Sequence, residues 1–149
     1  MKRGFTLIEL LIIMIIVGVL TAIALPKYQR ALERGRALEG LHNVRAAADY
    51  INAKYLAYAV NGQGYSAAVT DYENVGKSDL IRSRFFNSPV VSSSSANGAV
   101  VTIQRKEDTG WSYSLVATSV DGDIVSIECD GNEATCSGLD LIGNLVTRR

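Results

Sequence analysis

The pattern of hydrophobic and polar residues divides the chain near residue 26. From Phe5 to Leu25 almost every residue is apolar, and Glu9 is the single ionisable one. As a helix this run would be about 31 Å long, which is enough to cross the hydrocarbon core of a bilayer. The pattern therefore predicts a membrane-spanning helix at residues 5–26.

After this run the apolar residues follow the period of an amphipathic helix. Between residues 27 and 60 they recur at spacings of three and four, so they share one helix face. Asn61-Gly62 suits the end of such a helix. We expect residues 27–60 to extend the first helix as a spine, and the rest of the chain, rather than a coiled-coil partner, to cover its stripe. The predicted stripe contains Leu38, Leu41, Val44, Ala48, Ile51, Tyr55 and Tyr58.

Residues 61–98 show no steady period, and we expect them to form a connecting loop region. Ser78-Asp79 suits the cap of a short helix that runs through Phe86. The run Ser92–Ser95 has no apolar side chain to bury, so it predicts a mobile exposed turn. A glycosylated serine in this turn is the alternative to a bare loop.

Residues 99–129 have the pattern of an antiparallel β-meander. Ala99–Gln104 is rich in β-branched residues, and apolar and polar residues alternate from Trp111 to Thr118. The hairpin signal Asp121-Gly122 then precedes a third candidate strand, Ile124–Cys129. The sequence thus predicts an α+β fold in which a long helical spine packs against a small antiparallel sheet.

Two cysteines define the C-terminal segment, residues 129–149. Cys129 and Cys136 have six residues between them, several of them turn formers, so a disulfide would close a small loop and pin the tail. Two free thiols, or a metal pair without further ligands, are the alternatives. A disulfide would place this part of the chain in an oxidising compartment. The apolar tail Leu139–Val146 is expected to lie on the sheet as a fourth strand or an irregular strap.

The composition offers little material for catalysis or cofactor binding. The chain has 149 residues, enough for one domain and a membrane helix, and its 15 basic and 15 acidic side chains imply no general affinity for nucleic acids. His42, the single histidine, has no evident nucleophile to pair with. We therefore expect no enzymatic activity and no cofactor. A calcium site at Asp121, Asp123 and Asp130 is the alternative to a solvated acidic turn.

The N-terminal sequence, MKRGFTLIELL, resembles the class III signal and N-terminal helix of type IV pilins and of the related type II secretion pseudopilins. The resemblance covers roughly the first 30 residues. It implies that prepilin peptidase removes a leader, residues 1–4, by cutting between Gly4 and Phe5, and that the same enzyme methylates the amine of Phe5. It also implies an assembly role for Phe5 and Glu9, and a kink or melted segment at Gly18 and Pro26.

The residues themselves support these assignments. A carboxylate inside lipid is costly, and the cation nearest to Glu9 after cleavage is the amine of Phe5 on a neighbouring subunit. Cleavage would then switch assembly on; the alternative is a neutral side chain without a role. Pro26 removes a helix hydrogen bond and Gly18 lowers the cost of unwinding, which predicts a kink. The alternative is that Pro26 only marks the membrane exit.

The charges around the apolar helix conflict with a topology in which the leader faces the cytoplasm and the C-terminal body lies outside. Lys2 and Arg3 precede the helix, whereas five basic residues follow it by residue 45, so a count of charges would place the body in the cytoplasm. The leader must face the cytoplasm to be cut in this scheme, and a disulfide persists only outside it. We expect the chain to lie in the inner membrane with its C-terminal domain outside, and to enter an extracellular filament.

These observations predict a structural subunit of a type IV pilus. The resemblance implies as partners identical or related pilin subunits, prepilin peptidase, inner-membrane lipid, and an assembly platform with its ATPase. A minor pilin or a type II secretion pseudopilin is the first alternative; the cysteine pair favours a pilin, because major pseudopilins commonly bind calcium there. A membrane-tethered module for adhesion or DNA uptake is the second. The resemblance also implies the family's roles in cell adhesion and twitching motility, and the sequence does not decide between them.

Overall fold

The computed structural model divides the chain into two compact units, which meet between Gly35 and Arg36. The leader at residues 1–4 and the Ser78-Asp79 cap lie outside the described residues. Each unit is described below by itself. The structure describes residues 5–75, 81, 83–95, 97–106, 110–131, 135–137 and 146–148.

One helix, α1 (Leu7–Ala59), runs through both units, with Pro26 inside it. The sequence predicted this continuity, because the residues after Pro26 keep a helical period. The helix ends where glycine was expected to end it: Gly62 has φ +71°, a conformation that side chains with a Cβ rarely adopt. The predicted helix at 5–26 and its extension at 27–60 are thus confirmed as one element.

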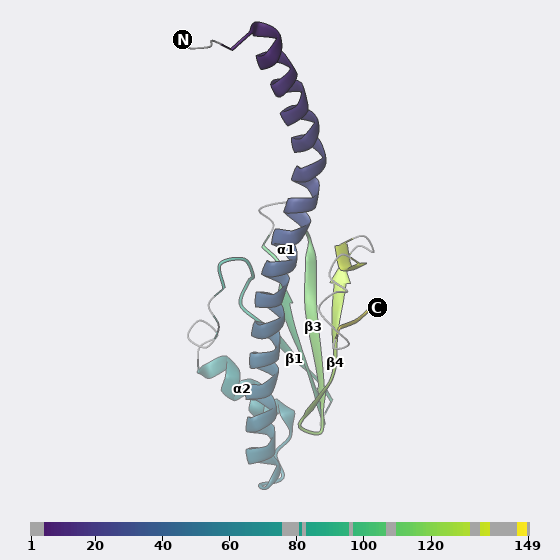
Figure 1. The fold of residues 1–149 in the computed structure, drawn as a ribbon. Coiled ribbons are helices and arrows are strands. Elements are labelled where there is room, and N and C mark those ends of the chain that lie inside the picture. Colours follow the sequence, from purple (N-terminus) through teal and green to yellow (C-terminus); the bar gives the residue numbers. More distant parts are fainter. Residues whose placement is uncertain are drawn as a thin grey trace. The chain divides into compact units, whose positions relative to one another are not determined.

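The second unit contains a five-stranded sheet in the order β1-β2-β3-β4-β5. The first four strands are antiparallel neighbours, and β5 pairs with β4 in parallel. Figure 1 shows the strands beside the part of α1 that belongs to this unit. The strands are β1 (Val90–Ser95), β2 (Gly98–Gln104), β3 (Tyr113–Val120), β4 (Asp123–Gly131) and β5 (Val146–Arg148).

The predicted meander is confirmed in β2, β3 and β4, including its turn. Asp121 and Gly122 both have positive φ, 52° and 93°, as a two-residue hairpin turn that matches the strand twist requires. The C-terminal tail contains a fifth strand, β5, which shares only Val146 with the predicted segment Leu139–Val146. Residues 138–145 of the tail lie outside the described part of the chain.

The exposed turn predicted at Ser92–Ser95 is wrong, because these serines belong to β1. Their backbone pairs with β2, with Ser92 opposite Val100 and Ser93 opposite Ala99. Val91, next to them, is buried and anchors the strand in the core. Backbone pairing with a neighbouring strand therefore overrides the low strand preference of a serine run.

The connecting region also differs from expectation. It contains a second helix, α2 (Tyr65–Asn74), which the sequence analysis did not predict. The short helix predicted to run through Phe86 is wrong, since residues 83–86 are not helical. The Ser83 hydroxyl accepts hydrogen bonds from the backbone N–H groups of Phe85 and Phe86 at 3.2 and 3.0 Å, so it offers the backbone an alternative to helical bonds.

The core of the second unit lies between α1 and the inner face of the sheet. Every second residue of β3 from Tyr113 to Ser119 is buried, and the buried residues of α1 follow spacings of three and four. The predicted stripe is confirmed at Val44, Ala48 and Ile51. It is wrong at Leu38, which is 53% exposed, because the stripe instead passes through Ala37 and Gly40.

Candidate assembly surface on the N-terminal helix

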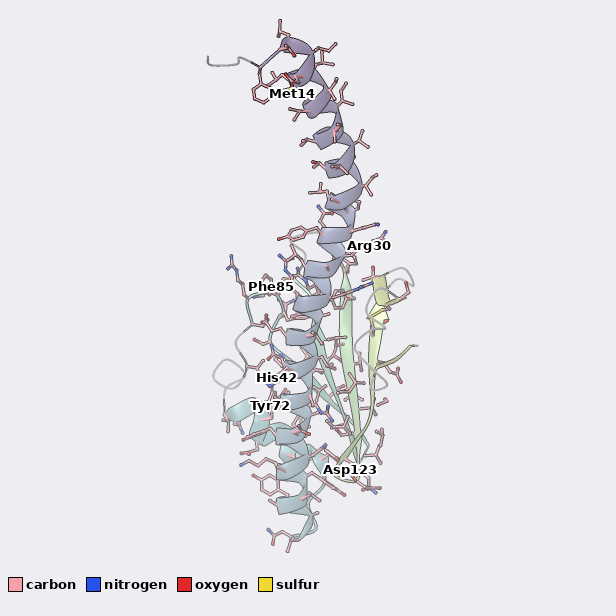
Figure 2. All side chains as sticks on the ribbon, in the orientation of Figure 1. Met14, Arg30, His42, Tyr72, Phe85 and Asp123 are labelled. Carbon is pink, nitrogen blue, oxygen red and sulfur yellow. A yellow bond between two sulfur atoms is a disulfide. The ribbon has the colours of Figure 1, made fainter. Side chains whose placement is uncertain are left out.

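The large apolar side chains from Phe5 to Leu25, in the N-terminal unit, are exposed. Their exposed fractions are 46–89%. Figure 2 shows side chains projecting from all sides of α1 around Met14. A helix that is hydrophobic on every side is stable only inside lipid or among other helices, and this one is long and apolar enough to cross a membrane. The surface therefore requires one of these two environments.

Glu9 interacts with Thr6 in a reciprocal capping box at the start of α1. Its Oε2 accepts hydrogen bonds from the Thr6 N–H at 3.3 Å and from the Thr6 hydroxyl at 3.1 Å, while its own N–H donates to the Thr6 Oγ1 at 3.4 Å. This arrangement satisfies donors that a helix N-terminus leaves unpaired. This contact was not predicted above, although the sequence has its usual signature, the spacing Thr-x-x-Glu.

The contact gives the Glu9 carboxylate a defined direction. It lies back over the first turn, toward Thr6, the residue that follows Phe5 in the chain. In the uncut chain the Phe5 nitrogen is an amide rather than an amine, so it carries no charge for Glu9 to meet. The pairing of Glu9 with a freed amine stays a prediction.

The predicted kink or melting between Gly18 and Pro26 also stays a prediction. The structure shows continuous α-helix through both residues. It adds a third feature that the sequence analysis missed: the Thr21 hydroxyl donates to the carbonyl oxygen of Val17 at 2.7 Å. Such bonding back to the residue four positions earlier weakens and bends helices slightly. Gly18, Thr21 and Pro26 thus all lie in the stretch that was expected to loosen.

The predicted disulfide is confirmed. Cys129 and Cys136 are joined, with their Cα atoms 5.8 Å apart, and both are buried. The bond holds residues 135–137 against β4, as expected for a loop that pins the C-terminal segment. Within the described residues, no group of three or more His, Cys, Asp or Glu side chains could hold a metal ion. The calcium alternative therefore gains no support from the described acidic residues.

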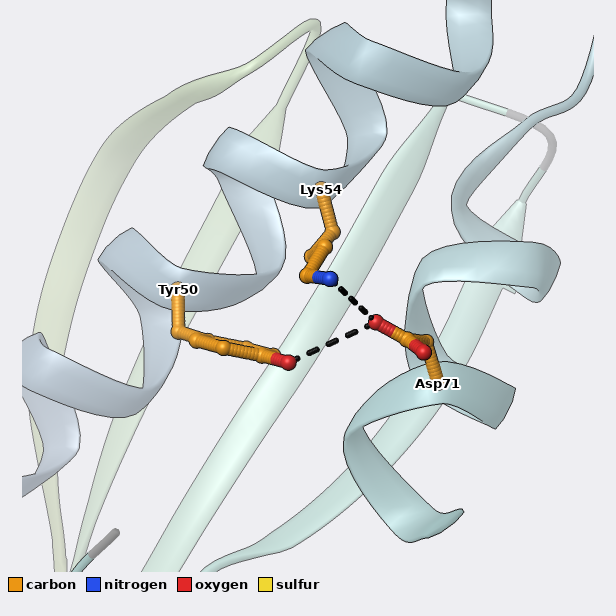
Figure 3. Close-up of polar contacts among 3 residues, drawn as sticks. All are labelled: Tyr50, Lys54 and Asp71. Carbon is orange, nitrogen blue, oxygen red and sulfur yellow. Dashed lines mark hydrogen bonds and ion pairs between the residues drawn. The ribbon is translucent and has the colours of Figure 1, made fainter. Parts of the chain in front are cut away.

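In the second unit, α2 is tied to α1 by a three-residue polar cluster (Figure 3). The Lys54 Nζ lies 2.8 Å from the Asp71 Oδ2, and the Tyr50 hydroxyl donates to the same oxygen at 3.4 Å. The hydrogen bond from Lys54 lowers the pKa of Asp71 below its usual value of 3.8. The same hydrogen bond raises the pKa of Lys54 above 10.5. Both side chains therefore stay charged over the neutral range.

A second junction joins α1, α2 and the β3–β4 turn at Tyr65, which is fully buried. The Tyr65 hydroxyl donates to the Asn52 Oδ1 at 3.0 Å and accepts from the Gly122 N–H at 2.8 Å. Its ring stacks on Tyr55 with centroids 4.1 Å apart. Burial raises the pKa of Tyr65, so its hydroxyl stays protonated and able to donate. This junction positions the turn relative to the spine.

Comparisons with known proteins relate both parts of the chain to one class. A family model described as a prokaryotic N-terminal methylation motif matches residues 1–25. The fimbrial protein EcpC of Eikenella corrodens is 31% identical over 136 residues, which cover 88% of this chain and 84% of the relative. The type IV major fimbrial protein FimA of Dichelobacter nodosus is 32% identical, with coverages of 73% and 70%. The type IV major pilin PilE of Neisseria gonorrhoeae is 30% identical, with coverages of 83% and 72%. No solved structure matches the chain significantly.

Proposed function

This chain belongs to the type IV pilins, and we propose that it is stored as a membrane-anchored subunit and polymerises through its N-terminal helix. The supporting observation is the uncovered apolar surface from Phe5 to Leu25 with one carboxylate in it. In the membrane, lipid covers this surface. In a filament, the same helices of neighbouring subunits would cover it, so assembly need not oppose the hydrophobic effect.

Processing at the N-terminus would switch the chain between these states. Prepilin peptidase would cut between Gly4 and Phe5 and methylate the new amine. That amine supplies the positive charge that residues 5–25 otherwise lack, and the Glu9 carboxylate of the next subunit would bind it. Because the pairing works between neighbours, it would set the axial stagger of identical helices.

The capping box with Thr6 would serve the stored subunit. Before assembly, the carboxylate of Glu9 has the hydrogen bonds from Thr6 in place of water, which lowers the cost of holding it in or near lipid. During assembly, an incoming amine would add to or replace these bonds with a stronger, charge-assisted one. Thr6 thus keeps the acceptor oriented until a charged partner forms the stronger bond.

The location and partners follow from the same scheme. The leader faces the cytoplasm, where the peptidase reaches it, and the second unit lies on the far side of the inner membrane, where the Cys129–Cys136 bond persists. An assembly platform and its ATPase would extract the subunit into the filament. The relatives named as major pilins favour a major subunit. The role is structural, and we assign no catalytic function.

Substitution of Glu9 tests this proposal. In cells that assemble the chain into pili, Glu9→Ala should leave insertion and cleavage intact and reduce sheared filaments by at least about tenfold, the cost of one lost charge-assisted contact. Filament yield, and the mass of the mature N-terminus, measure the two steps separately. Asp49→Ala, which removes an exposed acid from the same helix, is the matched control and should assemble normally.

Two results would contradict the proposal. Normal filament yield from Glu9→Ala would remove the role of this carboxylate. A native polypeptide that still begins at Met1 in assembled filaments would remove the role of cleavage, whatever the substitution does.

A further inference from the structure

Large apolar side chains are exposed at one end of the second unit, where the turn between β3 and β4 lies beside the end of α1 (Figure 1). Leu56 of α1 is 55% exposed, although its side chain also lies against the turn, 2.9 Å from where a Cβ on Gly122 would be. Val120 and Val125, on the two strands of this hairpin, are 39% and 59% exposed. We call this surface the hairpin tip, and it consists of Leu56, Val120, Asp121, Asp123 and Val125.

A bulge in β4 exposes Val125. Thr118 pairs with Ser126 and Ser119 pairs with Ile124, so Val125 between them has no partner on β3. Such bulges re-aim a side chain away from its place in a regular strand. Exposed apolar surface with a polar rim is typical of a site that binds another protein.

The hairpin tip is also acidic, and the chain around it supplies no cation. Asp121 and Asp123 are exposed, and no ion pair joins either of them to a described residue. Residues 107–147 contain eight acidic side chains and no Lys, Arg or His, and residues 55–76 contain no Lys, Arg or His either. The nearest basic residue of α1, Lys54, is paired with Asp71 at 2.8 Å. A partner for the tip must therefore supply positive charge.

The other end of the second unit carries basic side chains around Phe85. Three guanidinium groups lie near its ring, with Arg36 at 4.6 Å, Arg105 at 5.5 Å and Arg84 at 5.9 Å from the ring centre. The Lys106 Nζ donates to the carbonyl oxygen of Arg84 at 3.4 Å. We call Arg84, Phe85 and Lys106 the basic end.

The positive charge of the basic end is accessible. Arg36 and Arg105 have other interactions within the subunit, and Arg105 is buried. Arg84, by contrast, is exposed, and Lys106 is partly exposed, so these two can reach a partner. Arginine and aromatic side chains, which meet here at Phe85, are enriched in protein interfaces.

Few acids compete for this charge within the subunit. Residues 80–106 contain four basic side chains and no acidic one. Glu39 of α1 accepts a hydrogen bond from the Ser83 hydroxyl at 2.6 Å. Asp130 lies on β4, two strands away from β2. Glu107 and Asp108, which follow Lys106, lie outside the described residues.

The two surfaces are too far apart to meet within one subunit. Val120, next to the tip, is opposite Gly98 at the start of β2, whereas Ser114 is opposite Gln104 at its end, next to the basic end. From Ser114 to Val120 the strand rises about 20 Å. Figure 2 likewise shows Phe85 and Asp123 toward opposite ends of the unit. A contact between the two surfaces therefore needs a second copy.

The signs of the two surfaces decide how copies can meet. Two tips that faced each other in a two-fold dimer would bring their carboxylates together, and like charges repel. A tip on the basic end of another copy pairs opposite charges and leaves each copy with one surface still open. Such a head-to-tail contact continues from copy to copy, so it builds a filament rather than a closed dimer.

We propose that the hairpin tip of one subunit docks on the basic end of a second copy. The carboxylates of the tip face the guanidinium group of Arg84 and the ammonium group of Lys106, and its apolar side chains cover the Phe85 ring. This inference rests on the proposed function, since it adds a contact between second units to the one between N-terminal helices. The contact ties each second unit to the next along the filament.

Carbodiimide coupling of sheared filaments tests the contact directly, because this reagent joins a carboxylate to a lysine amine that touches it and adds no spacer. In the wild type, mass spectrometry should find peptides with Asp121 or Asp123 joined to peptides with Lys106. In the charge-conserving R84K variant, residue 84 should be joined as well. The products should form a ladder beyond dimers, because each copy has both surfaces. D121N/D123N is the control that should lose these links.

Charge reversal tests whether the contact matters for assembly. D123R and R84D should each reduce the yield of filaments by about tenfold, because each places like charges together. The combined D123R/R84D chain should recover to within about twofold of the wild type, since it restores opposite charges. D49R reverses an exposed acid of α1 outside both surfaces and should assemble normally. Circular dichroism checks that each variant is folded.

The inference and the proposed function fail in different ways. Wild-type and R84K filaments without these links would overturn the inference alone, as would links from the tip to another lysine, which would assign it to a different surface. A D123R/R84D chain that assembles no better than the single variants would also overturn it. Normal filaments from Glu9→Ala that still contain the links would overturn the proposed role of Glu9 and leave this contact standing.

Discussion

At the scale of single residues, Gly40 shows how a missing side chain makes room for an aromatic ring against the helix. A Cβ added to Gly40 would lie 2.5 Å from the Phe86 ring, which is closer than real Cβ contacts. In the sequence Gly40 resembles a simple interruption of the helix, because glycine lowers helix stability. The structure shows that the aromatic ring packs directly on the helix backbone at this position.

This packing predicts opposite effects for two glycine substitutions on the same helix. Gly40→Ala should destabilise the protein by about 1–3 kcal/mol, because the core must shift to admit a methyl group. Gly35→Ala, where nothing lies within 4 Å of the added Cβ, should stabilise it by up to about 1 kcal/mol through helix preference. Denaturant unfolding in detergent measures both. Equal effects at the two sites would show that Phe86 does not pack on Gly40.

The Tyr65 junction shows what sequence reasoning misses at this scale. Tyr65 follows Gly64 in a region without a steady period, so no pattern marks it as buried. Its partners, Asn52 and Gly122, are 13 and 57 residues away in the chain. A hydrogen bond between residues so far apart depends on where the chain folds, and the local sequence carries no signal for it.

At the scale of elements, α2 depends on a contact that titrates. One of its ties to α1 is the Lys54–Asp71 pair, and the pKa of Asp71 is lowered by the hydrogen bond from Lys54. A carboxyl group with a lowered pKa in the folded state stabilises that state above its unfolded pKa. The stabilisation is lost as the pH falls from the usual value of 3.8 through the lower folded value.

We therefore expect α2 to loosen from α1 at acidic pH. Amide hydrogen exchange in Tyr65–Asn74 should accelerate as the pH falls below about 4, beyond the intrinsic change in exchange rate, while exchange in β3 stays slow. Asp71→Asn should exchange faster at neutral pH and lose this additional acid response. Asp49→Asn, an exposed acid on α1, is the control and should behave as the wild type. An acid response unchanged in Asp71→Asn would contradict the assignment.

Whether each of the other helices and strands was predicted depends on whether its own residues carry the signal. The spine, β2, β3, β4 and the Asp121-Gly122 turn were predicted, because each has a period or a turn signal within its own residues. Strand β1 was missed because its serine run forms a strand only through backbone pairing with β2. Helix α2 was missed because it is only 10 residues long. Its buried residues, Tyr65, Ala68 and Tyr72, form an apolar face that is stabilised only by packing in the folded protein.

At the scale of the whole molecule, the two units need different environments. Among the residues that the structure describes, the buried apolar core lies in the second unit, from Ala37 to Cys136, whereas the large apolar residues of the first unit are exposed. The second unit thus carries its own core and its own disulfide. The first unit is a helix whose stability depends on lipid or on other subunits.

This division predicts that the chain without residues 1–28 is soluble and folded. The truncated protein should be monomeric in gel filtration, contain the Cys129–Cys136 bond, and unfold cooperatively by circular dichroism. The full-length chain should require detergent, because its apolar surface would otherwise associate. A truncated protein that aggregates or lacks tertiary structure would show that the second unit does not carry its own core.

The sequence alone determined the parts of this pilin whose chemistry is local. A long run of apolar residues needs lipid or other apolar helices around it, whatever the fold of the rest of the chain. The spacing of Gly4, Phe5 and Glu9 is likewise fixed by the sequence. The tertiary structure decided which residues share an environment: that β1 joins the sheet, that α2 packs beside α1, and that Gly40 and Tyr65 carry contacts. The physical reason is that burial and backbone pairing depend on distant partners, and only folding brings those partners together.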